Sequence, residues 1–301
     1  MNNILFRADS SSTIGTGHIM RDLVLASQYK DANTVFVVQD LEGNINHKIV
    51  EAGYKIEILK SNDIEELDKL IKKYDIDMIV IDHYGIDYEY EKQLKIQHST
   101  LKILSFDDTY KKHYCDILLN HNISADKGRY KDLVPKDCEL RCGSKYTLLR
   151  EEFYQEKAIK REKIYDVFIA MGGADGTNIN PKVLSVLSCF KNIQVNIVTT
   201  DANQKLDALK EVVKNKDWIK LHINSDDIAK LIAQSCLAII TPSVIANEVY
   251  FMQIPFIAIK VADNQNCMYE FLKKNNFPVL KKFDKSKLTK ILYDILGEKY
   301  V

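Results

Sequence analysis

The 301-residue sequence has no net charge, no C-x-x-C pair and no long apolar run. Its 42 Lys and Arg balance its 42 Asp and Glu, so nothing in the charge favours a nucleic acid or an acidic membrane surface as a partner. No apolar stretch approaches the roughly 18 residues of a membrane span, and we expect no secretion signal and a cytoplasmic location. The six scattered cysteines favour buried thiols over a disulfide framework or a zinc site.

What the sequence does contain is a regular alternation of short β-branched runs and amphipathic segments. Strands alternating with helices are typical of parallel sheets that are covered on both faces. The alternation restarts after about residue 150, and the charged stretch 148–166 reads as a helical connection. The sequence therefore predicts two doubly wound, Rossmann-like α/β domains, 1–150 and 151–301.

The expected elements follow from this alternation. In the first half, strands are predicted at 3–9, 34–40, 54–60, 77–84, 102–108 and 116–120, and helices at 19–29, 45–52, 64–74 and 87–97. In the second half, strands are predicted at 165–173, 193–200, 218–223, 237–243 and 255–260, with helices in the gaps and a last one at 284–301.

Open α/β sheets bind ligands outside the carboxyl ends of their strands, so loops that follow strands are the candidates. The first such loop ends in Gly15-Thr16-Gly17-His18. Gly15 and Gly17 permit a tight turn and a close approach of the backbone to a ligand. His18 is expected in the first turn of the next helix, where the dipole disfavours a protonated imidazole, and a neutral imidazole suits a general base. The alternative is a histidine that caps its helix or packs beneath the loop.

The second candidate loop follows the strongly apolar strand 77–84. Alternation along a strand places Asp82 and Tyr84 on one face and His83 on the other. We expect one of these residues to orient His18 or to contact a substrate hydroxyl. The alternative is a capping Asp and a packed Tyr.

In the second half, Gly172 and Gly173 end a strand ahead of a predicted helix. This pattern can present backbone amides to a diphosphate. It matches neither G-x-x-x-x-G-K-[ST] nor G-x-G-x-x-G, so it is not a P-loop or an ordinary dinucleotide fingerprint. The alternative is a plain turn between a strand and a helix.

Two further loops of the second half carry polar residues. Ser243 follows a strand, and Asn247 and Glu248 lie near the start of the next helix, where a carboxylate could bind a ribose diol. Asn264 and Gln265 follow the next strand, and their amides suit sugar hydroxyls and acetamido groups. The alternatives are a favourable charge near a helix N-terminus for Glu248 and ordinary capping around Asn264. Together these loops predict a nucleotide-sugar cleft between two domains.

Several segments resemble one known family over roughly residues 4–271: FRADSSSTIGTGHIMRDLVLA, IDHYGI, LSFDD, CDILLN, RCGSKYTLLREEF and MGGADGTN. They resemble the UDP-2,4-diacetamido-2,4,6-trideoxy-β-L-altropyranose hydrolases of bacterial pseudaminic acid biosynthesis. The resemblance implies a GT-B fold, related to the glycosyltransferase that makes lipid II. It also implies hydrolysis, without a metal or another cofactor, to UDP and the free diacetamido sugar.

By matching motifs, the resemblance implies a role for individual residues of this chain. His18 corresponds to the family's general base, and Tyr84 and Asn264 correspond to residues that line the sugar pocket. The UDP-binding loop and the ribose-binding carboxylate correspond to Gly172, Gly173 and Glu248.

Three functions compete at this point. In the first, His18 deprotonates water, which attacks the sugar C1 opposite UDP, and helix N-termini stabilise the departing diphosphate. In the second, a GT-B glycosyltransferase delivers the sugar to an acceptor, since one fold can host both reactions. In the third, the protein only binds a nucleotide sugar. The expected partner is a small-molecule UDP-sugar, with no nucleic acid and no membrane, and the expected state is a monomer. No cluster with metal-ligand spacing is apparent, so we expect no metal site.

Overall fold

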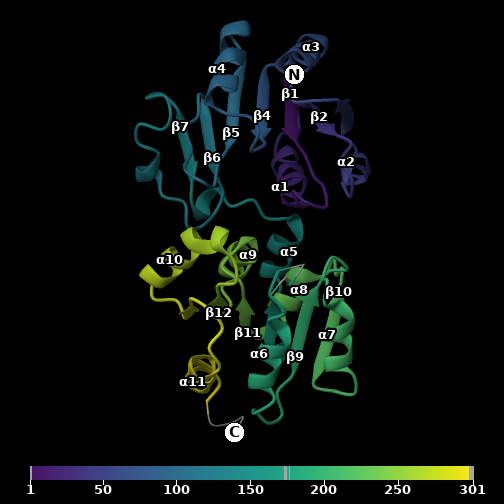
Figure 1. Ribbon diagram of the computed structural model, residues 1–301, viewed down its shortest axis with the longest axis vertical. Coiled ribbons are helices and arrows are strands. Elements are labelled where there is room, and N and C mark those ends of the chain that lie inside the picture. Colours follow the sequence, from purple (N-terminus) through teal and green to yellow (C-terminus); the bar gives the residue numbers. More distant parts are fainter. Residues whose placement is uncertain (1, 173–174, 176, 298–301) are drawn as a thin grey trace. The chain divides into compact units, whose positions relative to one another are not determined.

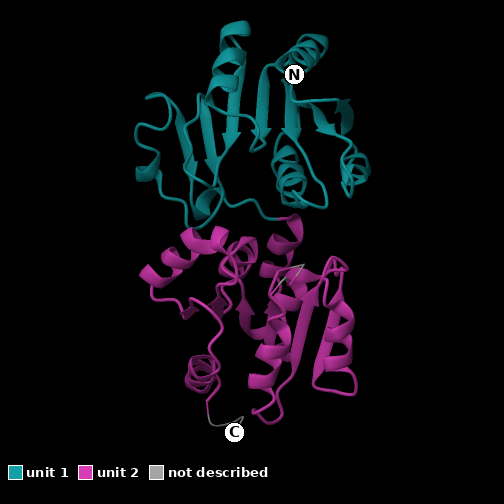
Figure 2. Cartoon of the chain, in the orientation of Figure 1, with its two compact units in different colours: residues 1–149 teal, residues 150–301 magenta. Residues whose placement is uncertain are grey.

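The computed structural model describes residues 2–172, 175 and 177–297 (Figure 1). The chain divides into two compact units, unit 1 at residues 1–149 and unit 2 at residues 150–301 (Figure 2). Within the described residues, no helix has both the length and the apolar character that a membrane crossing requires.

Unit 1 is built on a seven-stranded parallel sheet in the order β3-β2-β1-β4-β5-β6-β7. The strands are β1 Asn3–Ala8, β2 Asn33–Gln39, β3 Lys55–Leu59, β4 Met78–Asp82, β5 Lys102–Phe106, β6 Ile117–Asn120 and β7 Glu139–Cys142. The helices are α1 Gly17–Ala26, α2 Asn46–Glu51, α3 Ile64–Tyr74 and α4 Tyr88–Gln97, with short 3-10 turns at Lys127–Tyr130 and Ser144–Tyr146.

The central strands of unit 1 are apolar on both faces because helices cover both. Leu5 and Ile79 pack on one face with Leu67 of α3, and Phe6 and Val80 pack on the other with Ile19 of α1. Fully burying one such side chain is worth about 1.5–3 kcal/mol. A continuous apolar run with little polar alternation is therefore what a parallel strand in this position needs.

Unit 2 repeats the arrangement with six parallel strands in the order β10-β9-β8-β11-β12-β13. The strands are β8 Tyr165–Ala170, β9 Val195–Thr199, β10 Ile219–Ile223, β11 Ser235–Ile240, β12 Phe256–Ile259 and β13 Val279–Leu280. The helices are α5 Glu151–Ala158, α6 Asn180–Leu187, α7 Leu206–Val213, α8 Ile228–Ala233, α9 Val244–Met252, α10 Asn266–Lys274 and α11 Lys285–Leu296, with a 3-10 turn at Asp263–Gln265.

Each sheet has one point at which the strand order reverses direction. In unit 1 this point lies between β1 and β4, and in unit 2 it lies between β8 and β11. The loops that leave the carboxyl ends of these strands diverge there and leave room for a ligand. The topology thus selects four segments for close inspection, namely 9–16 and 83–87 in unit 1, and 171–179 and 241–243 in unit 2.

Two strands were not predicted from the sequence. The edge strand β7 reads Glu-Leu-Arg-Cys, and its Glu139 and Arg141 pair with each other at 2.8 Å on the exposed side. The other, β13, is only two residues long. Both lie at sheet edges, where the apolar signal of a buried strand is weakest.

Candidate active site

The first segment of unit 1 places His18 at the start of α1. Gly15 has a φ of 86°, which favours glycine, and its amide donates to the Ser11 carbonyl at 2.8 Å to close the turn. Helix α1 then begins at Gly17, so His18 lies in its first turn, where the sequence placed it. The His18 residue is 8% exposed and is thus buried at the start of the helix.

His18 contacts Asp82, the last residue of β4. The His18 Nδ1 atom lies 2.7 Å from Asp82 Oδ1. Burial would raise the pKa of Asp82, but Arg21 and the hydrogen bond from His18 hold this pKa well below its usual range. An ionised carboxylate can only accept, so Nδ1 carries the proton and the unprotonated nitrogen of a neutral His18 is Nε2. Chemically, this arrangement of Asp and His can act as a general base whose tautomer is fixed by a carboxylate.

Arg21 stands one helical turn after His18 and completes this group. Its Nε donates to Asp82 Oδ2 at 2.5 Å, and its Nη2 donates to Asp82 Oδ1. The guanidinium also lies over the Phe106 ring, 4.9 Å from the centroid. A fork-shaped, always charged donor thus fixes the plane of the carboxylate that orients His18. Sequence reasoning missed Arg21, and its spacing of three residues from His18 on one helix was the available signal.

Tyr84 contacts the same imidazole from the loop after β4. Its ring meets His18 edge-on at 5.1 Å between centroids, and its hydroxyl donates to Asp108 Oδ1 at 3.1 Å. Partial burial and Asp108 raise the pKa of Tyr84 to about 12, so the phenol is a neutral donor at pH 7. The Tyr84 residue is 57% exposed and so presents a surface to solvent beside the imidazole.

Behind this group lie two buried polar residues. Both carboxyl oxygens of Asp22 and both ring nitrogens of His121 have no hydrogen-bond partner among the described residues. Burial raises the pKa of Asp22 well above its usual value and lowers that of His121 to about 3. Burial thus favours the neutral form of the Asp22 carboxyl, and it keeps the His121 imidazole neutral at pH 7.

His83 lies in a separate network, as strand alternation predicted. Its Nδ1 accepts from the Gly85 amide at 3.0 Å, so its Nε2 carries the proton and donates to Asp9 Oδ2 at 3.0 Å. The guanidinium of Arg7, which is fully buried, donates to both carboxylate oxygens of Asp9, at 2.7 and 2.8 Å. The amide of Gln39 donates to the same carboxylate at 2.7 Å. This network ties the ends of β1, β2 and the loop after β4 together and leaves His18 as the histidine next to Asp82.

In unit 2, the loop after β8 contains Gly172, whose φ of 83° again favours glycine. Gly173 lies outside the described residues. Asp175 accepts from the amide of Ile179 at 2.9 Å and from the side-chain amide of Asn180 at 2.8 Å. Asp175 thus caps the start of α6, which leaves the turn fixed ahead of a helix N-terminus.

The loop after β11 brings three of the predicted residues together around α9. Ser243 precedes the helix, and its hydroxyl lies 2.9 Å from that of Thr241. Asn247 is buried and Glu248 is half-buried on the first two turns. Burial raises the pKa of Glu248 to about 7, against the opposing effect of Arg150. A carboxyl group that titrates near neutrality is characteristic of functional sites.

The last two predicted residues lie on the 3-10 turn after β12. Asn264 is exposed. The side-chain carbonyl of Gln265 accepts from the amides of Val261 and Ala262 at 2.9 and 3.3 Å, and so closes the turn on itself. The side-chain NH₂ of Gln265 is then the group that could donate to a ligand.

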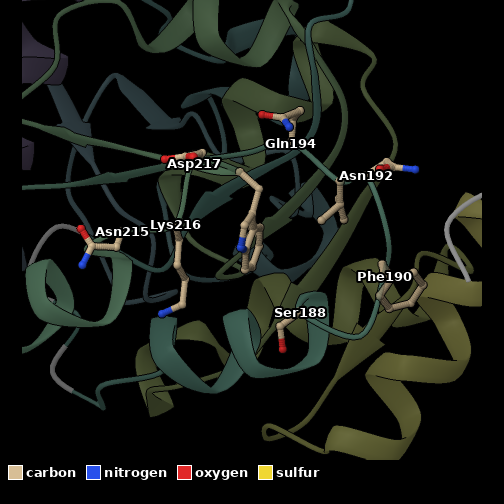
Figure 3. A pocket seen from close by; sticks show the side chains of 9 residues that line it. Ser188, Phe190, Asn192, Gln194, Asn215, Lys216 and Asp217 are labelled. Carbon is tan, nitrogen blue, oxygen red and sulfur yellow. The ribbon is translucent and has the colours of Figure 1, made fainter.

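One pocket of unit 2 lies away from these loops. A pocket of about 510 Å³, lined by residues that include Phe190 and Lys216, opens at the amino ends of β9 and β10 (Figure 3). It therefore lies at the opposite end of the unit 2 sheet from Gly172 and Ser243. Among the described residues, no group of three or more His, Cys, Asp or Glu side chains is arranged to hold a metal ion.

No family model matches the sequence, but individual proteins do. The UDP-2,4-diacetamido-2,4,6-trideoxy-β-L-altropyranose hydrolase of Campylobacter jejuni is 44% identical over 280 residues, which are 93% of this chain and 99% of the relative. The spore coat polysaccharide biosynthesis protein SpsG of Bacillus subtilis is 23% identical over 267 residues, which are 86% of this chain and 77% of that protein.

Solved structures of glycosyltransferases match nearly the full chain. MurG of Acinetobacter baumannii superposes with a TM-score of 0.67 at 11% identity, over 99% of this chain and 91% of MurG. The spinosyn rhamnosyltransferase SpnG, complexed with thymidine diphosphate, gives a TM-score of 0.62 at 12% identity, over 99% of this chain and 92% of SpnG. These likenesses show the fold alone, and they confirm the predicted GT-B fold with two doubly wound sheets. With 44% identity along nearly its whole length to the Campylobacter enzyme, the chain belongs to the family of UDP-2,4-diacetamido-2,4,6-trideoxy-β-L-altropyranose hydrolases.

Proposed function

We propose that this protein hydrolyses UDP-2,4-diacetamido-2,4,6-trideoxy-β-L-altropyranose to UDP and the free 2,4-diacetamido-2,4,6-trideoxy sugar. The observation that carries the proposal is the His18–Asp82 contact at 2.7 Å, at the point where the unit 1 sheet reverses its strand order, in a chain 44% identical to a hydrolase of that name. A transfer enzyme and a hydrolase can share the fold, so the argument depends on the site.

In the proposed reaction, His18 Nε2 accepts a proton from a water molecule. The water oxygen forms a bond to the sugar C1 on the face opposite the nucleotide. The bond between C1 and the phosphate oxygen breaks, and its electron pair leaves with UDP. The proton ends on His18 as an imidazolium, which the Asp82 carboxylate stabilises until the proton passes to solvent.

Unit 2 is proposed to bind the nucleotide. The loop at Gly172 and Gly173 would present backbone amides to the diphosphate, and the start of α6 would add the positive end of its dipole. Ser243 and Asn247 would add hydrogen bonds at the start of α9. The Glu248 carboxylate would accept both hydroxyls of the ribose, a role that needs its ionised form.

The sugar is proposed to contact residues of both units. Gly15 and Gly17 allow a close backbone approach next to His18, and the exposed Tyr84 ring offers an apolar surface and a phenol donor. Asn264 and the NH₂ group of Gln265 would bind the acetamido or hydroxyl groups. In this scheme the leaving diphosphate is stabilised by amide dipoles, so we propose that no metal or other cofactor takes part. A place in pseudaminic acid biosynthesis, a cytoplasmic location and a monomeric state are parts of the same proposal.

One assay separates this proposal from its competitors. Purified protein is incubated with the UDP-diacetamido sugar in buffer that contains EDTA and no acceptor, and UDP release is followed over time. We expect steady turnover, with UDP-N-acetylglucosamine as the control substrate that is not consumed. Turnover only after an acceptor is added would identify a transferase, and binding without turnover would identify a binding protein. Activity that EDTA abolishes and added magnesium or manganese restores would contradict the metal-free mechanism.

A further inference from the structure

Unit 1 contains a pair of thiols that the proposed reaction does not use. Cys115 lies just before β6, and Cys138 lies just before the neighbouring edge strand β7. Their Sγ atoms are 3.8 Å apart. A disulfide needs about 2.05 Å between the sulfur atoms, so the two must approach by only about 1.8 Å.

The backbone around the two thiols is already held in register. The Glu139 amide donates to the Asp116 carbonyl at 2.8 Å, and β6 and β7 pair from Ile117 opposite Glu139 onward. Each cysteine is therefore joined to a fixed strand end. Closing the remaining gap calls for a change at the side chains and not for a rearrangement of the sheet.

The pair is also open to a small oxidant. Cys138 is half-buried, and both cysteines line a pocket of about 220 Å³ together with Lys95, Tyr114 and Asp116. A hydrogen bond from Cys115 lowers the pKa of the Cys138 thiol, while this contact and burial raise the pKa of Cys115. Since the thiolate is the reactive form, Cys138 is the attacking group and Cys115 is the resolving one.

We propose that Cys115 and Cys138 form a reversible, peroxide-driven disulfide that fastens the edge strand β7 to β6. The Cys138 thiolate attacks hydrogen peroxide, which gives a sulfenic acid on Cys138 and releases hydroxide. The Cys115 sulfur then attacks the sulfenic sulfur, forms the S–S bond and releases water after proton transfer from its thiol. Two thiols and one peroxide thus yield one disulfide and two waters. A dithiol reductant reverses the reaction.

The position of the pair predicts which properties the disulfide changes. It lies at the amino ends of β6 and β7, whereas Asp82 is the last residue of β4 and Tyr84 follows it. Turnover should therefore stay within about twofold of the reduced protein. The disulfide closes a loop that includes β6 and pins a strand held on one side only, so the melting temperature should rise by roughly 5–10 °C.

The test is peroxide treatment of the reduced full-length protein, followed by alkylation of the remaining thiols, trypsin digestion and mass spectrometry. Cleavage after Lys112, Lys127, Lys136 and Arg141 places Cys115 alone in peptide 113–127 and Cys138 alone in peptide 137–141. We expect these two peptides joined, with the loss of two hydrogen atoms, and separated again by dithiothreitol.

Matched variants decide the outcome. Cys115→Ser and Cys138→Ser should abolish both the joined peptides and the rise in melting temperature. Cys142→Ser, which removes a buried thiol of β7, should leave both intact. The proposal is overturned if peroxide oxidises the two cysteines separately, if it joins either one to another cysteine, or if the joined protein melts at a lower temperature than the reduced one.

Discussion

The candidate sites of the two units occupy the same place in two like sheets but use different chemistry. In unit 1 the reversal point between β1 and β4 is surrounded by buried charged side chains, with Arg21, Asp82 and His18 in direct contact. In unit 2 the reversal point between β8 and β11 is surrounded by a glycine turn, hydroxyls and one carboxyl with a pKa near 7. The strand order determines where a ligand can bind, and the side chains at that place determine which chemistry is possible there.

This difference fits separate roles for the two units in the proposed reaction. In unit 1, Arg21 and Asp82 hold one imidazole in one tautomer, which would suit the proposed proton transfer. Backbone amides and hydroxyls would bind the diphosphate, because they donate hydrogen bonds and need no fixed charge, and the Glu248 carboxylate would bind the ribose. Changes in unit 1 should therefore alter turnover, and changes in unit 2 should alter nucleotide affinity.

The largest expected effect comes from His18→Phe or His18→Asn. Turnover should fall by roughly 10²–10⁴-fold, the usual contribution of a general base, while the dissociation constant for UDP changes by less than about twofold. His47→Gln, a change at an exposed histidine of α2, is the matched control and should leave both quantities unchanged. Near-normal turnover in a well-folded His18→Phe protein would leave His18 as a loop residue.

A loss of similar or smaller size is expected from Asp82→Asn. The neutral amide cannot stabilise an imidazolium as the carboxylate does, and its NH₂ group facing Nδ1 would fix the other tautomer, so turnover should fall by roughly 10²–10⁴-fold. The double variant Asp82→Asn with His18→Phe should be no slower than His18→Phe alone, because the two residues act as a unit. Losses that multiply in the double variant would show that Asp82 acts independently of His18.

A smaller effect is expected from Glu248→Gln in unit 2. The loss of hydrogen bonds to a charged group costs about 1.5–3 kcal/mol, so UDP should bind roughly 10–100-fold more weakly at pH 8. In the wild type the carboxylate protonates as the pH falls through about 7, so affinity should decline between pH 8 and pH 6. Calorimetry of Glu248→Gln should show the shallower decline that comes from UDP itself. Equal pH profiles for the two proteins would remove Glu248 from the ribose site.

The smallest effect concerns acid stability. The pKa values of Asp9 and Asp82 are depressed in the folded state, so their contribution to stability is present above pH 4 and is lost as the pH falls further. Burial raises the pKa of Asp22, but below about pH 4 this carboxyl is protonated in both states and no longer opposes the loss. Unit 1 should therefore unfold at a higher pH than unit 2.

One tryptophan makes this comparison measurable. Trp218, the single tryptophan of the chain, lies just before β10 and reports on unit 2 alone. Far-ultraviolet circular dichroism reports on both units. In an acid titration the dichroism should begin to change at a pH roughly 0.5–1 units above the change in tryptophan fluorescence. Coincident transitions would contradict the assignment of the acid-sensitive charges to unit 1.

Local pattern was enough to predict all strands but two and the loops that follow them, whereas the strand order and its reversal points came from the structure. Alternation alone placed Asp82 and Tyr84 together and His83 apart, because a strand turns successive side chains to opposite faces. The edge strands β7 and β13 escaped prediction because an edge needs few apolar residues.

Contacts between polar side chains that lie far apart in the sequence could not be predicted from it. Arg21 and Asp82 are 61 residues apart, and Tyr84 and Asp108 are 24 apart, so only the folded sheet shows them as partners. The burial of Asp22 and His121 could not be predicted from the sequence either, and it is burial that raises the pKa of Asp22 and lowers that of His121. The sequence also does not show that the side-chain carbonyl of Gln265 accepts from the backbone of its own turn, because this contact depends on the conformation of the turn after β12.

The central claim is that a base held by Asp82 activates water for attack at the sugar C1. The most direct measurement is product analysis after one round of turnover in isotopically labelled water, with the label located by mass spectrometry. The account predicts label in the free sugar and none in UDP, because the bond between C1 and oxygen is the one that breaks. Label in the phosphate of UDP would show attack at phosphorus and would contradict the account.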